Sequence, residues 1–229
     1  MTRQHLIVDA DDTLWENNIF FEQAYDEFYK FLAHSDMSHQ QVRDVLDAIE
    51  AVNAKRFGYG SLRFGKNLVE AYHRLAQREI NDSDLKTVVA FAESILNHPI
   101  ILRDEVEETL AHLVEVHDLT LFTKGHPEEQ QMKVDRSGLA RYFSHVGIVR
   151  EKDVQAYITL QKERSFHDEW TWMVGNSPRS DINPALEAGF NAVYIPHPRT
   201  WILEREEVRK GARGKLLELQ RFGELREHF

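Results

Sequence analysis

The sequence contains no cysteine among its 229 residues. This absence excludes a disulfide framework, a zinc site built on thiolates and a cysteine nucleophile. The sequence also lacks a continuous apolar run of about 18 residues, the length that a membrane-spanning helix requires. Its first residues do not show the basic and then apolar pattern of a secretory signal. We therefore expect a cytoplasmic protein that does not bind membranes.

Basic residues are few compared with acidic ones. The chain has 28 Lys and Arg residues against 38 Asp and Glu residues, a formal net charge of -10. Sequence-independent binding of nucleic acid needs a basic surface that releases counterions from the phosphates, so nucleic acid is not expected as a partner. The 12 His residues are scattered and form no H-E-x-x-H metal motif.

An apolar run near the start of the chain ends in three carboxylates. Leu6-Ile7-Val8 has the character of a central parallel strand that is buried on both faces, and Asp9, Asp11 and Asp12 follow it. Open α/β sheets bind ligands at the carboxyl ends of their strands. Crowded acids repel one another unless a cation or a proton compensates, so the cluster indicates a metal site or catalysis. An ordinary turn or helix cap is the alternative.

Residues 17–97 follow a helical period without an intervening strand. We expect an aromatic-striped helix first, and then a helix that a capping box opens at Ser38-His39-Gln40-Gln41. Phe57-Gly58-Tyr59-Gly60 should end this second helix, and two more helices should follow before Asn97. The four helices predict a small bundle that is inserted between the first strand and the second.

After Pro99 strands and helices alternate, which predicts a parallel sheet with right-handed crossovers. We expect strands at residues 119–122, 145–149, 170–174 and 191–195. The fold class is therefore α/β, with a Rossmann-like parallel sheet of about five strands in a core domain of residues 1–16 and 98–229. Residues 17–97 form the helical domain. The charged segment 204–229 is predicted to be a surface helix.

Polar side chains follow four of these strands. Thr123, Lys152 and the pair Asn176 and Asp181 come after later strands, as Asp9 and Asp11 come after the first. A hydroxyl, an ammonium and carboxylates in one crevice are the groups needed for phosphoryl transfer to a carboxylate nucleophile. Taken alone, Thr123 could cap a strand end, and Lys152 lies in a charged run that is typical of a solvated helix start.

These residues resemble the motifs of the haloacid dehalogenase (HAD) superfamily, whose members are mostly Mg-dependent phosphatases with an Asp nucleophile. D-x-D-x-T matches Asp9-Ala10-Asp11-Asp12-Thr13, and the motif Thr and Lys match Thr123 and Lys152. The fourth motif, usually G-D-x-x-x-x-D, matches Gly175-Asn176-Ser177-Pro178-Arg179-Ser180-Asp181. Asp12 replaces the commonest Gly, and Asn176 replaces a charged Asp with a neutral amide.

The resemblance implies a role for each matching residue. Asp9 attacks phosphorus and forms an aspartyl-phosphate. Asp11 protonates the leaving alkoxide and then acts as the base for the hydrolytic water. Lys152 offsets the charge of Asp9 and of the phosphate. The implied cofactor is Mg²⁺, held by the Asp9 carboxylate, the Asp11 backbone carbonyl, Asn176 and Asp181.

Substrate contacts are implied in two regions. Thr123, with the amides of Lys124 and Gly125, should hold the non-bridging phosphate oxygens. The helical insertion occupies the position of a C1 cap, which closes over the site and selects the leaving group. Candidates for contact with the substrate are Trp15, Asn18, Arg56 and Arg63. The two arginines could instead pack the end of the bundle.

We therefore predict a Mg²⁺-dependent phosphomonoesterase for a small phosphorylated metabolite, such as a nucleotide or a sugar phosphate; both a monomer and a homodimer agree with the sequence. A dehalogenase would not need Asp11, because a halide leaves unprotonated. A phosphonatase would use a Schiff-base Lys in the cap. A phosphomutase remains an alternative, and so does a binding or regulatory protein without turnover, which Asn176 makes worth testing.

Overall fold

The structure is a computed structural model that describes residues 3–32, 36–209 and 213–229. The chain divides into two compact units. Unit 1 contains Met1–Asn18 and Ile100–Phe229, and unit 2 contains Ile19–Pro99.

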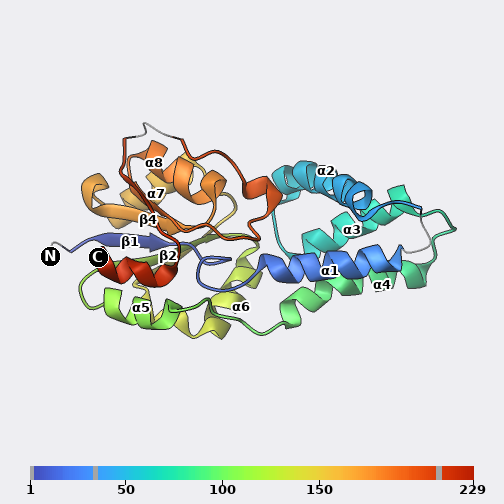
Figure 1. The fold of residues 1–229 in the computed structure, drawn as a ribbon, viewed down its shortest axis with the longest axis horizontal. Coiled ribbons are helices and arrows are strands. Elements are labelled where there is room, and N and C mark those ends of the chain that lie inside the picture. Colours follow the sequence, from blue (N-terminus) through green and yellow to red (C-terminus); the bar gives the residue numbers. More distant parts are fainter. Residues whose placement is uncertain (1–2, 33–35, 210–212) are drawn as a thin grey trace. The chain divides into compact units, whose positions relative to one another are not determined.

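Unit 1 is built on a parallel sheet of six strands (Figure 1). The sheet order is β3-β2-β1-β4-β5-β6, so the order reverses between β1 and β4. Ligands of such sheets bind beyond the carboxyl ends of the strands at this reversal. The strands are β1 (His5–Val8), β2 (Asp118–Lys124), β3 (His145–Val149), β4 (Thr171–Gly175), β5 (Asn191–Tyr194) and β6 (Leu216–Glu218).

Helices cover both faces of this sheet (Figure 1). Helices α5 (Val106–Leu113) and α6 (Pro127–Ser137) lie on one face, and α7 (Val154–Arg164) and α8 (Asn183–Ala188) lie on the other. In β1, Leu6 and Val8 join the hydrophobic cluster of α5 and α6, while Ile7 joins that of α7 and α8. Burial on both faces explains the uninterrupted apolar run, and the expected α/β parallel-sheet fold is confirmed.

The last part of the chain differs from the prediction. Where the sequence predicted one surface helix over 204–229, the structure has a sixth strand, β6, and a short 3₁₀ helix, η6 (Phe222–Glu227). Another 3₁₀ helix, η5 (Ile202–Glu204), ends where the predicted helix begins. β6 pairs with β5 in parallel, and Leu217 and Leu219 pack on the core. A three-residue edge strand is too short to show a period of two, so its leucines fit a helical face equally well. Residues 210–212 of the predicted helix lie outside the described residues.

Unit 2 consists of four α-helices and a short 3₁₀ helix, η1 (Ser94–Asn97), within the described residues. The predicted capping box is confirmed, because the Gln41 amide donates to Ser38 Oγ and the Ser38 amide donates to Gln41 Oε1. The predicted break is also confirmed, since the second helix ends at Phe57 and Gly58 follows with φ 80°. The helices are α1 (Asn18–Phe31), α2 (His39–Phe57), α3 (Ser61–Leu75) and α4 (Asp82–Glu93).

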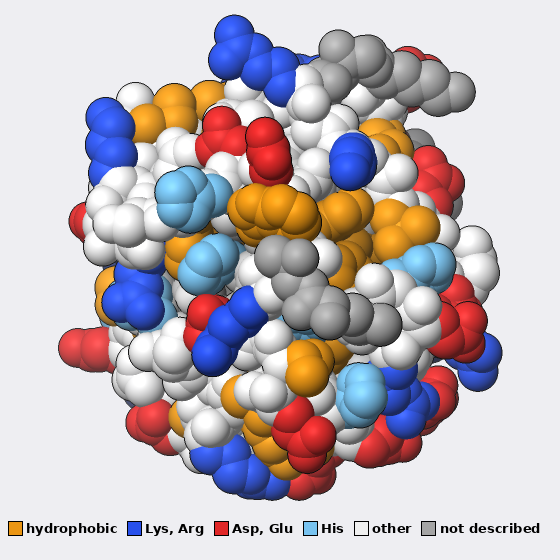
Figure 2. All heavy atoms as spheres, turned by 90° about the vertical axis from the view of Figure 1, so that its left-hand side faces the viewer, with side chains coloured by type: hydrophobic (Ala, Val, Ile, Leu, Met, Phe, Trp, Pro, Cys, Tyr) orange, Lys and Arg blue, Asp and Glu red, His pale blue; other side chains and the backbone are white. Residues whose placement is uncertain are grey.

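The surface of unit 1 carries some exposed hydrophobic residues, among them Val116 and Trp170. Figure 2 shows hydrophobic side chains gathered near the middle of one side, with charged side chains around them. Among the described residues, no helix has both the length and the apolar character needed to cross a membrane.

The capping box yields a stability prediction for unit 2. Replacement of Ser38 by Ala removes the acceptor for the Gln41 amide, so we expect the free energy of unfolding to fall by about 1 kcal/mol. Ser38→Asp, which keeps an acceptor oxygen, is the matched control and should stay near the wild type. Urea unfolding followed by helical circular dichroism measures both variants. Equal loss in both would contradict the capping role.

Candidate functional site

The centre of the site is a buried ammonium between two carboxylates. Lys152 Nζ lies 2.5 Å from Asp9 Oδ1 and 2.5 Å from Asp181 Oδ1. All three side chains are buried. Burial opposes the charged form of Lys152, but the charges of Asp181 and Asp9 outweigh it and raise the pKa of this lysine. Burial and the nearby Asp9 charge raise the pKa of Asp181, although Lys152 opposes that rise.

The backbone brings these three groups together from separate strand ends. Asp9 directly follows β1, and its amide donates to the carbonyl of Val174 in β4. Lys152 follows β3 and precedes Asp153, which caps α7 by accepting from the Ala156 amide. Asp181 lies in η4 (Pro178–Ile182), a π-helix that follows β4.

Gly175 explains how Asp181 reaches back to the end of β4. A Cβ at Gly175 would lie 2.3 Å from Asp181 Oδ2, so only glycine permits this close packing. The second oxygen of Asp181 accepts from the Ser177 amide at 2.9 Å. Both oxygens of Asp181 are thus held, one by Lys152 and the other by the backbone.

Thr13 joins Asp9 to Asn176. Its hydroxyl oxygen lies 2.8 Å from Asp9 Oδ2 and 3.1 Å from Asn176 Oδ1. The Thr13 hydroxyl has one hydrogen and can donate it to only one of these two oxygens at a time. The two oxygens therefore lie close together with a single donor between them. Asn176 Nδ2 donates to Thr200 Oγ1 at 3.3 Å, which turns the amide oxygen toward Thr13.

Asp11 is held by three side chains. Trp15 Nε1 donates to Asp11 Oδ1 at 2.8 Å, and Gln130 Nε2 donates to Asp11 Oδ2 at 3.1 Å. Lys133 Nζ lies 2.7 Å from Oδ1 and 2.6 Å from Oδ2. Asp11 is partly exposed, unlike Asp9.

A second charged group surrounds Lys124. Its Nζ lies 2.5 Å from Glu204 Oε1 and 2.8 Å from Ser180 Oγ. The hydroxyls of Ser177 and Ser180 also donate to Glu204. Burial opposes ionisation of Glu204, but Lys124 and these hydroxyls outweigh it and lower its pKa. The contacts tie the segment after β5 to the start of η4.

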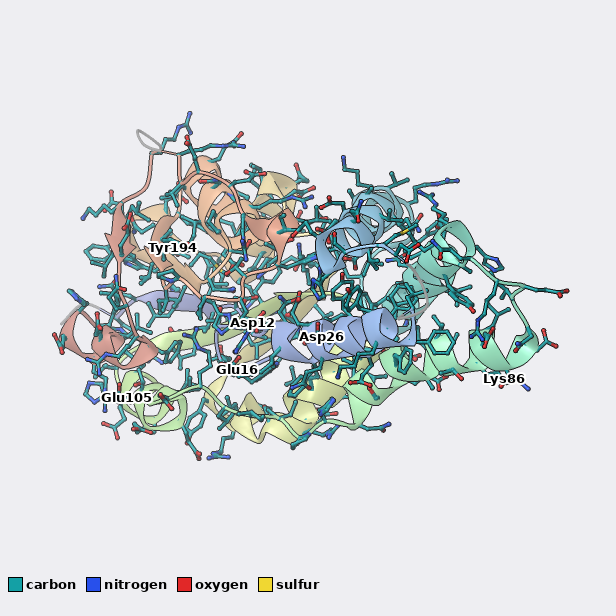
Figure 3. All side chains as sticks on the ribbon, turned by 45° about the vertical axis from the view of Figure 1, so that its right-hand side comes forward. Asp12, Glu16, Asp26, Lys86, Glu105 and Tyr194 are labelled. Atoms are coloured by element: carbon teal, nitrogen blue, oxygen red, sulfur yellow. The ribbon has the colours of Figure 1, made fainter. Side chains whose placement is uncertain are left out.

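A third group lies where the chain leads into α1. Figure 3 shows Asp12 and Glu16 close together there. Their carboxylate oxygens and a ring nitrogen of His197 lie within 4.8 Å of one another, a spacing that could hold a cation. Arg103 already supplies positive charge there, since its Nη1 donates to the Asp12 carbonyl. Burial lowers the pKa of Arg103, although the charges of Glu16 and Asp12 oppose the fall.

Asp12 has a left-handed backbone with φ 61°, the conformation that glycine adopts most easily. Its carboxylate accepts from the amides of Asn17 and Asn18 at the start of α1. Burial raises the pKa of Asp12 to about 7, although these two amides oppose the rise. The acid at this position thus supplies a helix cap that glycine lacks.

The comparisons with known proteins agree with this geometry. A family model for haloacid dehalogenase-like hydrolases matches residues 4–189. The chain belongs to this family. A haloacid dehalogenase-like family hydrolase from Xanthomonas campestris is similar to it, with 27% identity, a TM-score of 0.84 and coverage of 99% of this chain and 94% of that one.

Other solved structures with this HAD-like fold have different described activities. A 2-haloacid dehalogenase from Pseudomonas syringae has 20% identity and a TM-score of 0.63, covering 99% of this chain and 97% of its own. A predicted phosphoglycolate phosphatase from Haemophilus somnus has 16% identity and a TM-score of 0.65, covering 100% and 98%. No curated protein matches the chain. The family makes this protein a hydrolase, and the likenesses below 25% identity show the fold.

The structure brings the predicted catalytic residues of the HAD-like hydrolase into two hydrogen-bonded groups that both start from the loop after β1. Asp9 contacts Lys152 and, through Thr13, Asn176. Asp11 connects to Thr123 through Gln130, whose amide nitrogen lies 2.6 Å from Thr123 Oγ1. Their chemical roles stay predictions.

Three of the predicted substrate contacts have other partners in the structure. Trp15 is buried in the core, and its indole N–H holds Asp11, so it offers no surface to a substrate. Asn18 Nδ2 donates to the carbonyl of Arg199 at 2.7 Å, so this donor is already in use. The Gly125 amide donates to the Val149 carbonyl as an extension of the sheet, so it is not an available phosphate donor. The spacing of residues in the sequence does not show in which direction these side chains and this amide point.

Arg56 and Arg63 lie in unit 2. Their guanidinium groups lie 5.2 Å and 5.6 Å from the ring centre of Phe57, within the range of a cation–π interaction. Phe57 itself is about half exposed. The two arginines thus flank one exposed aromatic ring, and contact with a substrate stays a prediction.

The residues present fit a hard divalent cation such as Mg²⁺. Asp9 and Asn176 present oxygens that share one hydroxyl donor, and oxygens are the ligands that Mg²⁺ prefers. Within residues 3–32, 36–209 and 213–229, no hydrogen-bond donor reaches the Asp11 carbonyl oxygen, the third expected ligand. The buried group of Asp9, Asp181 and Lys152 has two acids for one base, and a cation would balance it. A contact with Asp181 stays a prediction.

Sequence reasoning missed Gln130, Lys133 and Glu204. None of them directly follows a strand, and the position after a strand is what marks the other site residues in the sequence. Gln130 and Lys133 are three residues apart on α6 and therefore share a face. Helix α6 begins four residues after Thr123, so the spacing from Thr123 could have indicated that this face lies near the end of β2. Glu204 lies in a charged segment that gave no signal.

The high pKa of Asp12 predicts a pH effect on stability. Between its ordinary pKa of 3.8 and about 7, the folded protein binds a proton at Asp12 that the unfolded chain does not. Relative to Asp12→Asn, the wild type should therefore lose about 1.4 kcal/mol of unfolding free energy per pH unit as the pH rises through this window. Urea unfolding of both proteins in metal-free buffer at several pH values measures the difference. Parallel pH profiles would contradict it.

Proposed function

We propose that this chain is a Mg²⁺-dependent phosphomonoester hydrolase that acts on a small phosphorylated metabolite through an aspartyl-phosphate at Asp9. The observation that carries the proposal is the contact of Lys152 with Asp9 at the reversal of the sheet order, with Asp11 two residues further along. A carboxylate held there by Lys152 can be directed toward phosphorus. Family membership supports hydrolysis, and Asp11 supports a phosphate ester as the substrate.

The residues of the chain would divide the chemistry among them. Lys152 orients Asp9 through Oδ1 and offsets its charge, which reduces its repulsion of a phosphate dianion. Thr123 would donate its hydroxyl hydrogen to a non-bridging oxygen. A bound Mg²⁺, held by Asp9, Asn176 and the Asp11 carbonyl, would supply charge neutralisation. Asp11 would give a proton to the leaving alkoxide and later take one from water.

Dehalogenation is the competing activity, since a 2-haloacid dehalogenase has the same fold. A halide leaves without a proton, so that reaction gains nothing from an acid at Asp11. This chain holds Asp11 with three side chains. An acid that is held in a fixed position supports a leaving group that needs a proton, such as an alkoxide. The predicted phosphoglycolate phosphatase with this fold is consistent with phosphate ester chemistry.

The first test uses p-nitrophenyl phosphate. We expect Mg²⁺-dependent phosphate release that chelation abolishes, and we expect Asp9→Asn to reduce it to the level without enzyme, because an amide does not attack phosphorus. Circular dichroism should show that the variant is folded. Asp135→Asn, an exposed acid on α6, is the control and should keep full activity. Retention of turnover by Asp9→Asn would refute the nucleophile assignment.

The same assay separates the remaining alternatives. A folded wild-type protein that releases no phosphate with any divalent cation would favour a binding or regulatory protein. Chloride release from 2-chloropropionate would favour a dehalogenase. Transfer of phosphate to a sugar phosphate instead of water would favour a phosphomutase. A panel of phosphorylated metabolites, including nucleotides and sugar phosphates, then identifies the substrate.

A second prediction concerns the proton donor. Asp11→Asn should lose about 100-fold or more in kcat on an alkyl phosphate such as glycerol 2-phosphate, because its alkoxide needs a proton to leave. The loss on p-nitrophenyl phosphate should be smaller, since nitrophenolate leaves without one. Steady-state kinetics on both substrates measures the split. Equal losses on the two esters would contradict the acid role.

A further inference from the structure

Helix α6 directs two side chains, Gln130 and Lys133, at residues of the proposed site. Resting on the proposed function, we infer that both are positioning residues: Lys133 fixes the carboxylate of Asp11, and Gln130 couples Asp11 to Thr123. Neither residue belongs to the four sequence motifs. Both would act through Asp11 and Thr123, the side chains that they contact.

Lys133 holds both oxygens of Asp11 at once. Its Nζ lies 2.7 Å and 2.6 Å from them and 3.0 Å from Asn17 Oδ1. The Trp15 indole N–H donates to Asp11 Oδ1 as well. A carboxylate bound by an ammonium and an indole does not rotate freely about its side-chain bonds. Lys133 thus restricts the directions in which Asp11 can exchange a proton with a substrate.

Gln130 connects the two parts of the site. Its amide nitrogen lies 2.6 Å from Thr123 Oγ1, 3.1 Å from Asp11 Oδ2 and 3.1 Å from the Lys124 carbonyl. Gln130 is buried. A hydroxyl that accepts from an amide directs its own hydrogen elsewhere, so this contact turns the Thr123 hydrogen away from Gln130. That orientation suits donation to a phosphate oxygen.

The backbone makes room for this arrangement at Gly125. Its φ is 150°, and a Cβ there would lie 2.9 Å from Gln130 Cγ. Glycine therefore lets the Gln130 side chain cross over the turn between β2 and α6. Pro127 begins α6 immediately afterwards, and its fixed φ suits the first turn of a helix. Residues 130 and 133 then fall on the same helix face.

A purely structural ion pair is the alternative to positioning. Loss of a structural pair would lower stability and would reduce activity equally on all substrates. Loss of a positioning residue changes how activity depends on the leaving group, because Asp11 matters most when the leaving oxygen needs a proton. The two possibilities therefore differ in a measurable ratio.

The kinetic test compares Lys133→Met and Lys133→Arg on p-nitrophenyl phosphate and glycerol 2-phosphate. We expect Lys133→Met to lose about tenfold more kcat on the alkyl ester than on the aryl ester. The reason is that a misplaced Asp11 would lose part of its rate contribution as a general acid, which only the alkyl ester needs. Lys133→Arg keeps a cation that can bind both oxygens and should recover most of this difference. Lys162→Met, an exposed lysine on α7, is the control and should match the wild type. Equal losses on both esters would overturn the positioning role of Lys133.

Gln130 is tested in the same assay with Gln130→Met, which keeps the length of the side chain and removes its donors. We expect a rise in KM for both esters, because the Thr123 hydroxyl is no longer oriented toward phosphate. A greater loss of kcat on the alkyl ester should accompany it. Unchanged KM and an unchanged ratio of the two kcat values would overturn the coupling role.

A spectroscopic readout separates this inference from the proposed function. The chain has 4 Trp residues, and Trp15→Phe identifies the indole N–H signal of Trp15 in nitrogen-edited NMR. Release of Asp11 in Lys133→Met should raise the solvent exchange rate of this N–H, and Lys133→Arg should restore it. An unchanged rate would overturn the inference. A raised rate in a protein without phosphatase turnover would uphold the positioning and refute only the proposed function.

Discussion

The structure of the site depends on one buried ammonium, Lys152, that two carboxylates share. Removing ions from water costs several kcal/mol for each ion, and only close and complete pairing recovers that cost. Asp9, Asp181 and Lys152 are buried, so each must be placed accurately. The parallel sheet achieves this because the ends of β1, β3 and β4 lie at one edge. The remaining negative charge explains why such a site would bind a divalent cation.

The loop after β1 serves a second purpose besides presenting Asp9 and Asp11. Asp12 has a left-handed backbone conformation that glycine would adopt at a lower free-energy cost. Its carboxylate accepts hydrogen bonds from the first amides of α1. The same five-residue motif, Asp9 to Thr13, therefore both presents Asp9 and Asp11 and leads into the first helix of the insertion. Asp12 is buried, and this burial raises its pKa to about 7.

The sequence predicted the sheet well because long apolar runs and strict alternation with helices leave few other topologies. It predicted Asp9, Lys152 and Asn176 as neighbours for the same reason, since strand ends in a parallel sheet converge. Side-chain direction was not predictable. Trp15 points into the core and Asn18 bonds to a loop more than 180 residues away in sequence, contacts that only tertiary packing decides. Edge strand β6 was too short to show its period.

Asn176 stands where the fourth HAD motif usually has an Asp, and the segment after β5 explains how an amide can be oriented at this position. A carboxylate presents oxygen in either orientation, whereas an amide presents oxygen only if its nitrogen is held elsewhere. Thr200 accepts from Asn176 Nδ2, and Thr13 donates toward Asn176 Oδ1. The segment that carries Thr200 is itself anchored by Glu204, which Lys124, Ser177 and Ser180 hold in place. The amide oxygen of Asn176 is therefore oriented toward Thr13 and Asp9 by contacts on both sides.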